Sequence, residues 1–99
     1  MSNTEYEDGP APGISWDDYA TVMASDYRQR VLKQMDDPIT PTELSGALDL
    51  KISHVSRTLS KLREMGFVDL LVSEDTQKGR YYGRTDAGER LTDALENND

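Results

Sequence analysis

Cysteine is absent from this chain of 99 residues, and histidine occurs only once, as His54. Without cysteine the chain has no disulfide, no thiolate metal site and no thiol redox sensor. A single histidine does not make a metal cage by itself. We therefore expect a protein with no cofactor and no bound metal ion.

The sequence also has no apolar run that approaches the length of a membrane span, and its acidic N-terminus lacks the basic start and apolar middle of a signal peptide. We expect a cytoplasmic protein that does not contact a membrane. Three catalytic patterns are missing too: a nucleophile with a nearby base, a glycine-rich phosphate loop, and a carboxylate pair in a helical or strand context. These absences predict that the protein is not an enzyme.

Basic residues are few, 11 against 19 acidic ones, and the formal net charge is −8. The charge is unevenly divided: residues 1–50 carry −7, residues 51–84 carry +3 and residues 85–99 carry −4. A localised basic segment is what a nucleic-acid surface needs, whatever the sign of the whole chain. The acidic residues are 12 Asp and 7 Glu. High Asp and low Lys resemble proteins of halophilic archaea, whereas an acidic mesophilic protein is the alternative.

Residues 40–66, TPTELSGALDLKISHVSRTLSKLREMG, predict two short helices separated by a tight turn. Thr40 can cap the first helix, with Pro41 at its first position and Glu43 placed to complete a capping box. Asp49 tolerates the left-handed backbone that the corner requires. Leu50 and Ile52 are expected to anchor that corner. The segment is a helix-turn-helix candidate.

The second helix of this pair is predicted over residues 53–65, with Ser53 as its cap and Gly66 as its stop. Val55, Leu59 and Leu62 share one face, and small hydroxyls interleaved with cations occupy the other. That exposed face suits a recognition helix in a DNA major groove, where Arg binds guanine bidentately and Ser donates or accepts a hydrogen bond.

The chain before this pair begins with an acidic segment, residues 1–13, that carries too little apolar surface to order itself. From Ser15 apolar residues follow a helical period to Met35, either as one helix or as two with a break near Ser25, which we favour. Trp16 and Tyr19 present a large aromatic surface, either to a partner subunit or to the last helix of this chain. Ile39 is a one-residue candidate for a short strand.

After Gly66, two β-prone runs, residues 67–72 and 80–84, flank a polar loop and predict a hairpin, the wing. In its loop, residues 73–80, Lys78 and Arg80 are either phosphate contacts or solvated turn residues. We expect Tyr81 and Tyr82 to lie in the core. Thr85 caps a last helix.

The helix-turn-helix LSGALDLKISHVSRTLSKLREMGFV and the wing ending GRYYGRTDAGERL resemble the winged helix-turn-helix regulators of bacteria and archaea, the MarR-like and ArsR-like group. The resemblance covers residues 25–95. It implies a mainly α fold with a small antiparallel β hairpin in one compact domain, residues 14–96, followed by a frayed C-terminus, residues 97–99. It also implies a homodimer that binds a palindromic double-stranded DNA operator.

The resemblance carries site residues with it. On the groove-facing surface it places Ser53, His54, Ser56, Arg57 and Lys61, and on the wing Lys78 and Arg80. With Lys51 and Ser60, these form the predicted DNA-binding set. The predicted dimerisation residues are Trp16, Tyr19, Leu91 and Leu95. Two positions depart from the family pattern: Asp49 replaces a frequent Gly, and Arg84 replaces a usually apolar residue.

The metal-sensing members of that group use Cys pairs or His and Asp clusters, which this sequence lacks. The sequence does not name a small-molecule effector. A sequence-specific transcriptional regulator is the function that we predict. The alternative is a winged-helix adaptor that binds protein through its acidic surface or its Trp16 region, and does not bind DNA.

Overall fold

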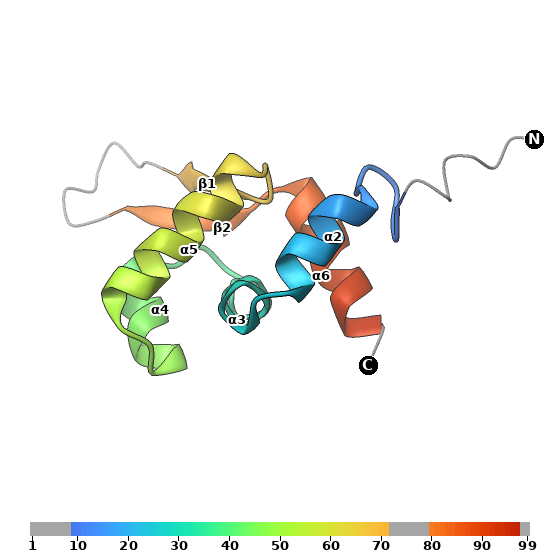
Figure 1. The fold of residues 1–99 in the computed structure, drawn as a ribbon. Helices are drawn as coiled ribbons and strands as arrows, with labels where there is room; N and C mark the ends of the chain where they lie inside the picture. The colour runs from blue at the N-terminus through green and yellow to red at the C-terminus, as the bar shows by residue number, and fades with distance from the viewer. Residues whose placement is uncertain (1–8, 72–79, 98–99) are drawn as a thin grey trace, which may run out of the picture.

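The computed structural model describes residues 9–71 and 80–97. Within these residues the expected order of elements is present (Figure 1). The elements are α2 (Trp16–Met23), α3 (Asp26–Gln34), α4 (Pro41–Leu48), α5 (Ile52–Glu64), β1 (Val68–Leu71), β2 (Tyr81–Arg84) and α6 (Asp86–Asn97). The break predicted near Ser25 is confirmed, and the predicted fold class, a winged helix-turn-helix, is confirmed with it.

Local capping explains where the first helices begin. The Ser25 side chain accepts a hydrogen bond from the Arg28 amide at 3.3 Å, so a new helix starts after the break. At α4 the capping box is complete: Thr40 Oγ1 accepts from the Glu43 amide, and Glu43 Oε1 accepts from the Thr40 amide, each at 3.1 Å. Asp49 ends α4 in the left-handed region, with φ 57° and ψ 48°.

The predicted cap of α5 at Ser53 is wrong. The cap residue is Lys51, whose side chain makes no capping hydrogen bond. The Lys51 carbonyl accepts from the amides of His54 and Val55, at 2.9 and 3.1 Å. The cap of the helix therefore lies two residues before the expected one. Ser53 therefore lies within the first turn of α5, where it is exposed.

The wing strands pair antiparallel in a register that joins Val68 to Arg84 and Leu71 to Tyr81. Ile39 forms an isolated bridge to Tyr82, with the two backbone hydrogen bonds at 3.0 and 2.9 Å, and this confirms the one-residue strand. The hairpin thus receives a third, minimal strand from the segment between α3 and α4. Tyr82 packs against the core as expected, whereas Tyr81 is half-buried and is not among the side chains packed on the core. The expectation that both lie in the core is therefore wrong for Tyr81, because successive residues of a strand point to opposite faces.

The start of α6 is tied to the end of α5. Thr85 Oγ1 accepts from the Gly88 amide at 3.0 Å and donates to the Gly66 carbonyl at 2.7 Å. A Cβ at Gly88 would lie 2.0 Å from the Phe67 carbonyl oxygen, so only glycine allows this approach. The TDAG run is therefore the joint that closes the wing onto the helix-turn-helix.

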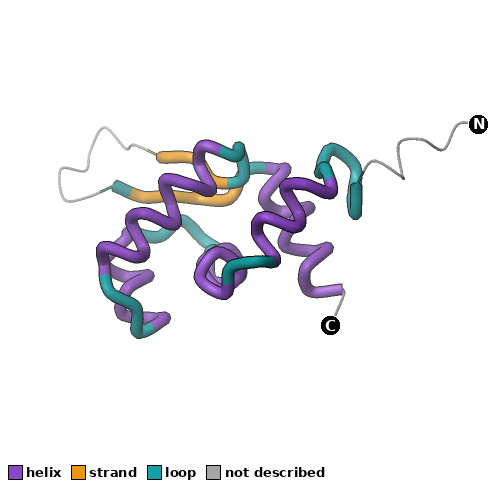
Figure 2. The backbone as a smooth tube through the Cα atoms, viewed as in Figure 1, coloured by secondary structure: helices purple, strands orange, loops and turns teal. Residues whose placement is uncertain are grey.

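Helix α3 runs through the middle of the fold, with α4, α5 and the hairpin on one side and α2 and α6 on the other (Figure 2). The buried apolar side chains form one core around it. They are Ile14, Tyr19, Val22, Val31, Leu32, Met35, Leu44, Val55, Leu59, Leu62, Phe67, Val68, Leu91 and Leu95. Because α3 contributes to both sides, it positions α5 relative to the rest of the domain.

Residues 9–13, which we expected to belong to a disordered tail, lie against the domain. The Ile14 amide donates to the Ala11 carbonyl at 3.0 Å, and Arg90 Nε of α6 donates to the Pro12 carbonyl at 2.9 Å. This turn places Ile14 in the core. The prediction for residues 1–8 lies outside the described residues.

Candidate nucleic-acid interface

Helix α5 has a buried face and a polar face that differ sharply in chemistry. Val55, Thr58, Leu59 and Leu62 are buried against the core. The outward face carries Lys51 at the cap position and then Ser53, Ser56, Arg57 and Ser60, all exposed. Residues 52–63 include no acidic side chain, although the chain as a whole is strongly acidic. The structure therefore brings together on one helix every predicted contact except the two on the wing.

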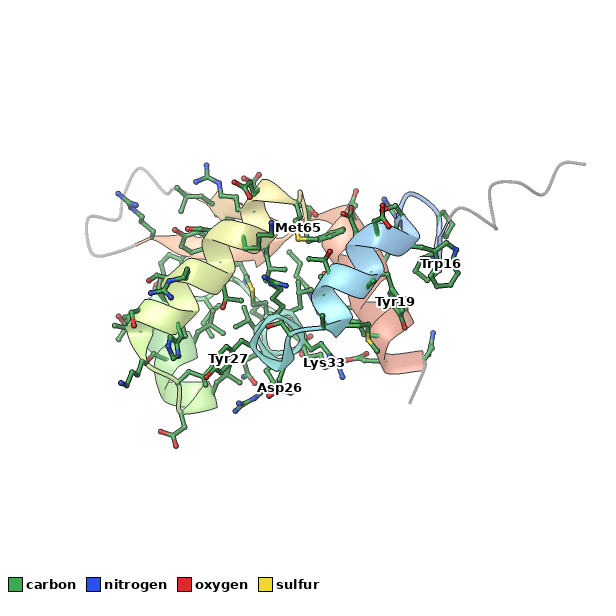
Figure 3. The ribbon with its side chains drawn as sticks, viewed as in Figure 1. Trp16, Tyr19, Asp26, Tyr27, Lys33 and Met65 are labelled. Carbon is green, nitrogen blue, oxygen red and sulfur yellow. The ribbon has the colours of Figure 1, made fainter. Side chains whose placement is uncertain are left out.

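One edge of α5 forms a cationic hollow with the N-terminus of α3. Its volume is about 440 Å³, and its walls are Ser25, Tyr27, Arg28, His54, Arg57, Thr58 and Lys61. His54 and Tyr27 lie ring to ring, with centroids 5.1 Å apart and an interplanar angle of 36°. Figure 3 shows Tyr27 between α3 and the lower part of α5. Four basic side chains and a helix N-terminus make this hollow suitable for an anion such as a DNA phosphate.

Within the hollow the cations differ in what holds them. Arg28 Nη1 donates to the Thr21 carbonyl at 2.8 Å, which fixes its guanidinium beside the α2–α3 break. Lys61 Nζ lies 3.8 Å from Glu64 Oε1, and both side chains are solvated. For Arg57, no hydrogen bond or ion pair is found within residues 9–71 and 80–97. Arg57 is thus the cation best able to make a new contact.

The turn before α5 is fixed from both sides. Arg30 Nη2 of α3 donates to the Leu48 carbonyl at 2.8 Å, where α4 ends. The Leu50 amide donates to the Ser45 carbonyl at 3.1 Å, and the Ser45 hydroxyl donates back to the Leu50 carbonyl. Leu50 packs against the core as predicted, but Ile52 is 48% exposed. The expectation that Ile52 anchors the corner is therefore wrong, because Leu50 alone fills that place.

The wing is described at its base. Arg80 is exposed immediately before β2. Lys78 and the rest of the predicted contact loop, residues 73–79, lie outside the described residues.

The predicted dimerisation residues do not form one exposed surface. Tyr19 is 8% exposed, and Leu91 and Leu95 are buried in the core of this same chain. Trp16 is 51% exposed and meets the Tyr19 ring edge to face at 5.7 Å. Figure 3 shows Trp16 at the outer side of α2, far from α5. Apolar spacing on α2 and α6 identified these residues, and it does not distinguish a core from an interface.

Three features of the candidate interface were missed from the sequence: Tyr27, Arg28 and the exposure of Ile52. Tyr27 and Arg28 belong to α3, which is separated from α5 in the sequence by α4, and only the packing of α3 on α5 brings them beside it. The break predicted near Ser25 was the one local sign that a helix N-terminus, which attracts anions, is present there.

Among the residues that the structure describes, no group of three or more His, Cys, Asp or Glu side chains is placed to hold a metal ion. The helices within that part of the chain are all too short or too polar to cross a membrane.

Comparison with known proteins supports the same fold. A family model described as a helix-turn-helix domain matches residues 23–70. Among solved structures, apo MarR from E. coli is similar with a TM-score of 0.69 and 22% identity, over 80% of this chain and 61% of that one. No curated protein matches the chain by sequence.

Two similar structures contain nucleic acid. FabT from Streptococcus pneumoniae in complex with DNA has a TM-score of 0.67 and 19% identity, over 74% of this chain and 52% of that one. An S. aureus MepR mutant bound to an oligodeoxyribonucleotide has a TM-score of 0.69 and 19% identity, over 82% of this chain and 62% of that one. This chain thus spans between half and two thirds of the length of these structures, and at such identities the likeness shows the fold alone.

Proposed function

We propose that this protein is a sequence-specific, double-stranded DNA-binding transcriptional regulator. Helix α5 lies in the major groove, and the wing loop, residues 73–80, lies on phosphates or in the minor groove. The observation that carries the proposal is the outward face of α5, where serines alternate with cations and no acidic residue precedes Glu64. A helix surface that only needs solubility would carry acidic side chains as freely as the rest of this chain does.

The separation of charge supports the same function. Phosphate neutralisation requires cations where the duplex lies, and an acidic surround elsewhere repels the duplex from non-productive faces. Arg57, Lys61 and His54 form the edge of α5 that faces the hollow, and Arg28 adds a cation from α3. The outward face, which includes Arg57, contacts the bases and gives specificity, and Arg28, His54 and Lys61 contact phosphates and position the helix. Similar structures of FabT and MepR were solved with nucleic acid, which is consistent with this use of the fold.

A homodimer completes the proposal, because a single recognition helix covers one half-site only. Trp16 and Met23, 51% and 42% exposed, lie seven residues apart on α2 and so share one side of that helix with the exposed Ala20. We assign this side of α2 to the contact between subunits, in place of the buried Tyr19, Leu91 and Leu95. The protein works in the cytoplasm without a cofactor, and its composition fits the concentrated salt of a halophilic archaeon.

The test is a selection in which the full chain binds sequences from a pool of random duplexes, at about 0.1 M and at about 1 M potassium chloride. Charge interactions are weakly screened at the lower concentration and strongly screened at the higher one. We expect an enriched motif with two inverted half-sites about one helical turn apart. No retention at either salt, by a protein shown to be folded, would reject the DNA-binding function. The exposed side of α2 would then be better explained as the surface by which an adaptor binds another protein.

The first substitution to test is Arg57→Ala. Arg57 is exposed in the middle of α5, so its loss should cost about 1 to 3 kcal/mol of specific binding and relax the preference at one base position. Affinity and preference are measured by titrating the selected operator and its single-base variants.

Lys33→Ala is the matched control for Arg57→Ala. It removes one positive charge from α3 at a residue that does not line the hollow. We expect Lys33→Ala to leave the base preference unchanged. An equal loss on all sequences from both variants would show that Arg57 acts as a general cation and does not read a base.

A further inference from the structure

Ile52 is held in an exposed position at the beginning of α5. It is the first residue of the helix, and 48% of its surface is accessible, although isoleucine is among the most often buried residue types. The hydrogen bonds between Ser45 and Leu50 and between Arg30 and Leu48 fix the preceding turn. Leu50 takes the place in the core, so the turn directs Ile52 outward. The exposure is a product of this geometry.

The position of Ile52 on the helix separates it from the cations. At about 100° per residue, Ile52 and Ser56 lie one turn apart on one edge of α5, and Ser53 lies on the outward face. His54, Arg57 and Lys61 lie on the opposite edge, where they line the hollow with α3. Helix α5 therefore has one edge that carries His54, Arg57 and Lys61, and another edge that begins with Ile52 and Ser56 and carries its cation, Arg63, only in the last turn.

The chemistry of the major groove selects a ligand for such an edge. N-terminal residues of a recognition helix are the ones that reach base edges. The base edges in that groove present hydrogen-bond donors, acceptors and a single kind of apolar group, the C5-methyl of thymine. An isoleucine without a polar atom gains nothing from the donors and acceptors. It gains contact and buried apolar surface from a methyl group.

We propose that Ile52 reads the C5-methyl group of a thymine in each half-site of the operator. This inference rests on the proposed DNA-binding function and adds a base preference to it. Cytosine and uracil lack the methyl group at C5, so both should be disfavoured at this position. Ser56, one turn further on, is then placed against the neighbouring base pair.

The experiment replaces each thymine of the selected operator by deoxyuridine, which removes the methyl group and keeps the hydrogen-bonding pattern. For the natural sequence, one symmetric pair of positions should show a loss of about fourfold per half-site, the value of one buried methyl-sized group. In Ile52→Ala the preference for thymine over uracil at that pair should disappear. In Ile52→Val, which keeps a shorter branched side chain, it should be reduced.

Met23→Ala is the matched control, because it truncates an exposed apolar side chain on α2. Its thymine-over-uracil ratio should equal that of the natural sequence, even if a weakened dimer lowers the affinity for both operators. Circular dichroism melts of all variants establish that they are folded.

The outcomes separate this inference from the proposed function. If an operator is selected and bound but contains no thymine in its half-sites, or if the thymine preference survives in Ile52→Ala, the role of Ile52 is rejected and DNA binding stands. If the folded protein selects no duplex, both are rejected.

Discussion

Arg84 is the more deeply buried of the two wing cations within the described residues, Arg80 and Arg84, and its contacts reach far along the chain. Its side chain is 7% exposed; Nη1 donates to the Leu32 carbonyl at 3.1 Å, and Nη2 lies 2.9 Å from Asp36 Oδ1 and 3.6 Å from Glu89 Oε1. Its Nε is buried and has no hydrogen-bond partner in the part of the chain that the structure describes. Arg84 stands where the winged helix-turn-helix regulators that this sequence resembles usually have an apolar residue, and here it joins β2 to α3 and α6.

Two substitutions distinguish the packing of Arg84 from its charge. Arg84→Met keeps most of the side-chain volume and removes the unsatisfied Nε. The carboxylates of Asp36 and Glu89 are exposed, so water can solvate them in the variant. We therefore expect the free energy of unfolding to change by no more than about 1 kcal/mol. Arg84→Ala leaves a cavity at the joint and should cost about 2 to 4 kcal/mol. Urea unfolding measures both. If Arg84→Met is as destabilising as Arg84→Ala, the ion pairs carry the stability and the packing does not.

At the scale of an element, α4 depends on its capping box more than on its length. It has eight residues, too few to be stable without caps and packing. Its buried Leu44 packs in the core, so α4 supports the turn that positions α5. Fraying of α4 at Thr40 would therefore disturb the position of α5.

Thr40→Ala removes the acceptor for the Glu43 amide and should lower the free energy of unfolding by about 1 kcal/mol. Thr42→Ala, an exposed position in the same helix, is the matched control and should stay within about 0.5 kcal/mol. Urea unfolding followed by circular dichroism compares them. Equal losses would mean that the hydroxyl of Thr40 contributes nothing as a cap.

At the scale of the whole molecule, the net charge of −8 opposes compaction, whereas in the proposed function the cations of α5 attract DNA. Added potassium chloride screens both the repulsion within the chain and the attraction to DNA, so it should stabilise the fold and weaken DNA binding. We expect the free energy of unfolding to rise with salt, and the affinity for the operator to fall with a log–log slope near −0.9 for each neutralised phosphate.

The double variant Asp93→Asn, Glu96→Gln tests the stability part of this prediction. These exposed acids lie in the last turns of α6, which has no basic residue there, so they oppose both each other and the helix dipole. The variant should be more stable at low salt and gain less from added salt, as thermal melts would show. If added salt stabilises the variant as much as it stabilises the natural sequence, charge repulsion on α6 is not the cause of the salt effect.

Much of this fold was predictable because its signals are local. The Thr40 capping box, the Ser25 break, the left-handed Asp49 and the Thr85 cap each depend on residues within a few positions of one another, and all were confirmed. The amphipathic period of α5 likewise separated Val55 and Leu62 from the outward serines and Arg57. The start of α5 was misplaced, because the backbone carbonyl of Lys51 begins the helix without a capping side chain.

The tertiary structure decided what depends on residues far apart in the chain. The spacing of Tyr19, Leu91 and Leu95 shows only that they lie on apolar faces of helices. The packing of α2 and α6 around α3 buries these faces within one chain. Leu50 and Ile52 look equally suited to the core, and the hydrogen bonds to Ser45 and Leu48 turn only one of them inward. Periodicity defines which residues share a face, whereas the partner of that face is set by contacts that no local pattern contains.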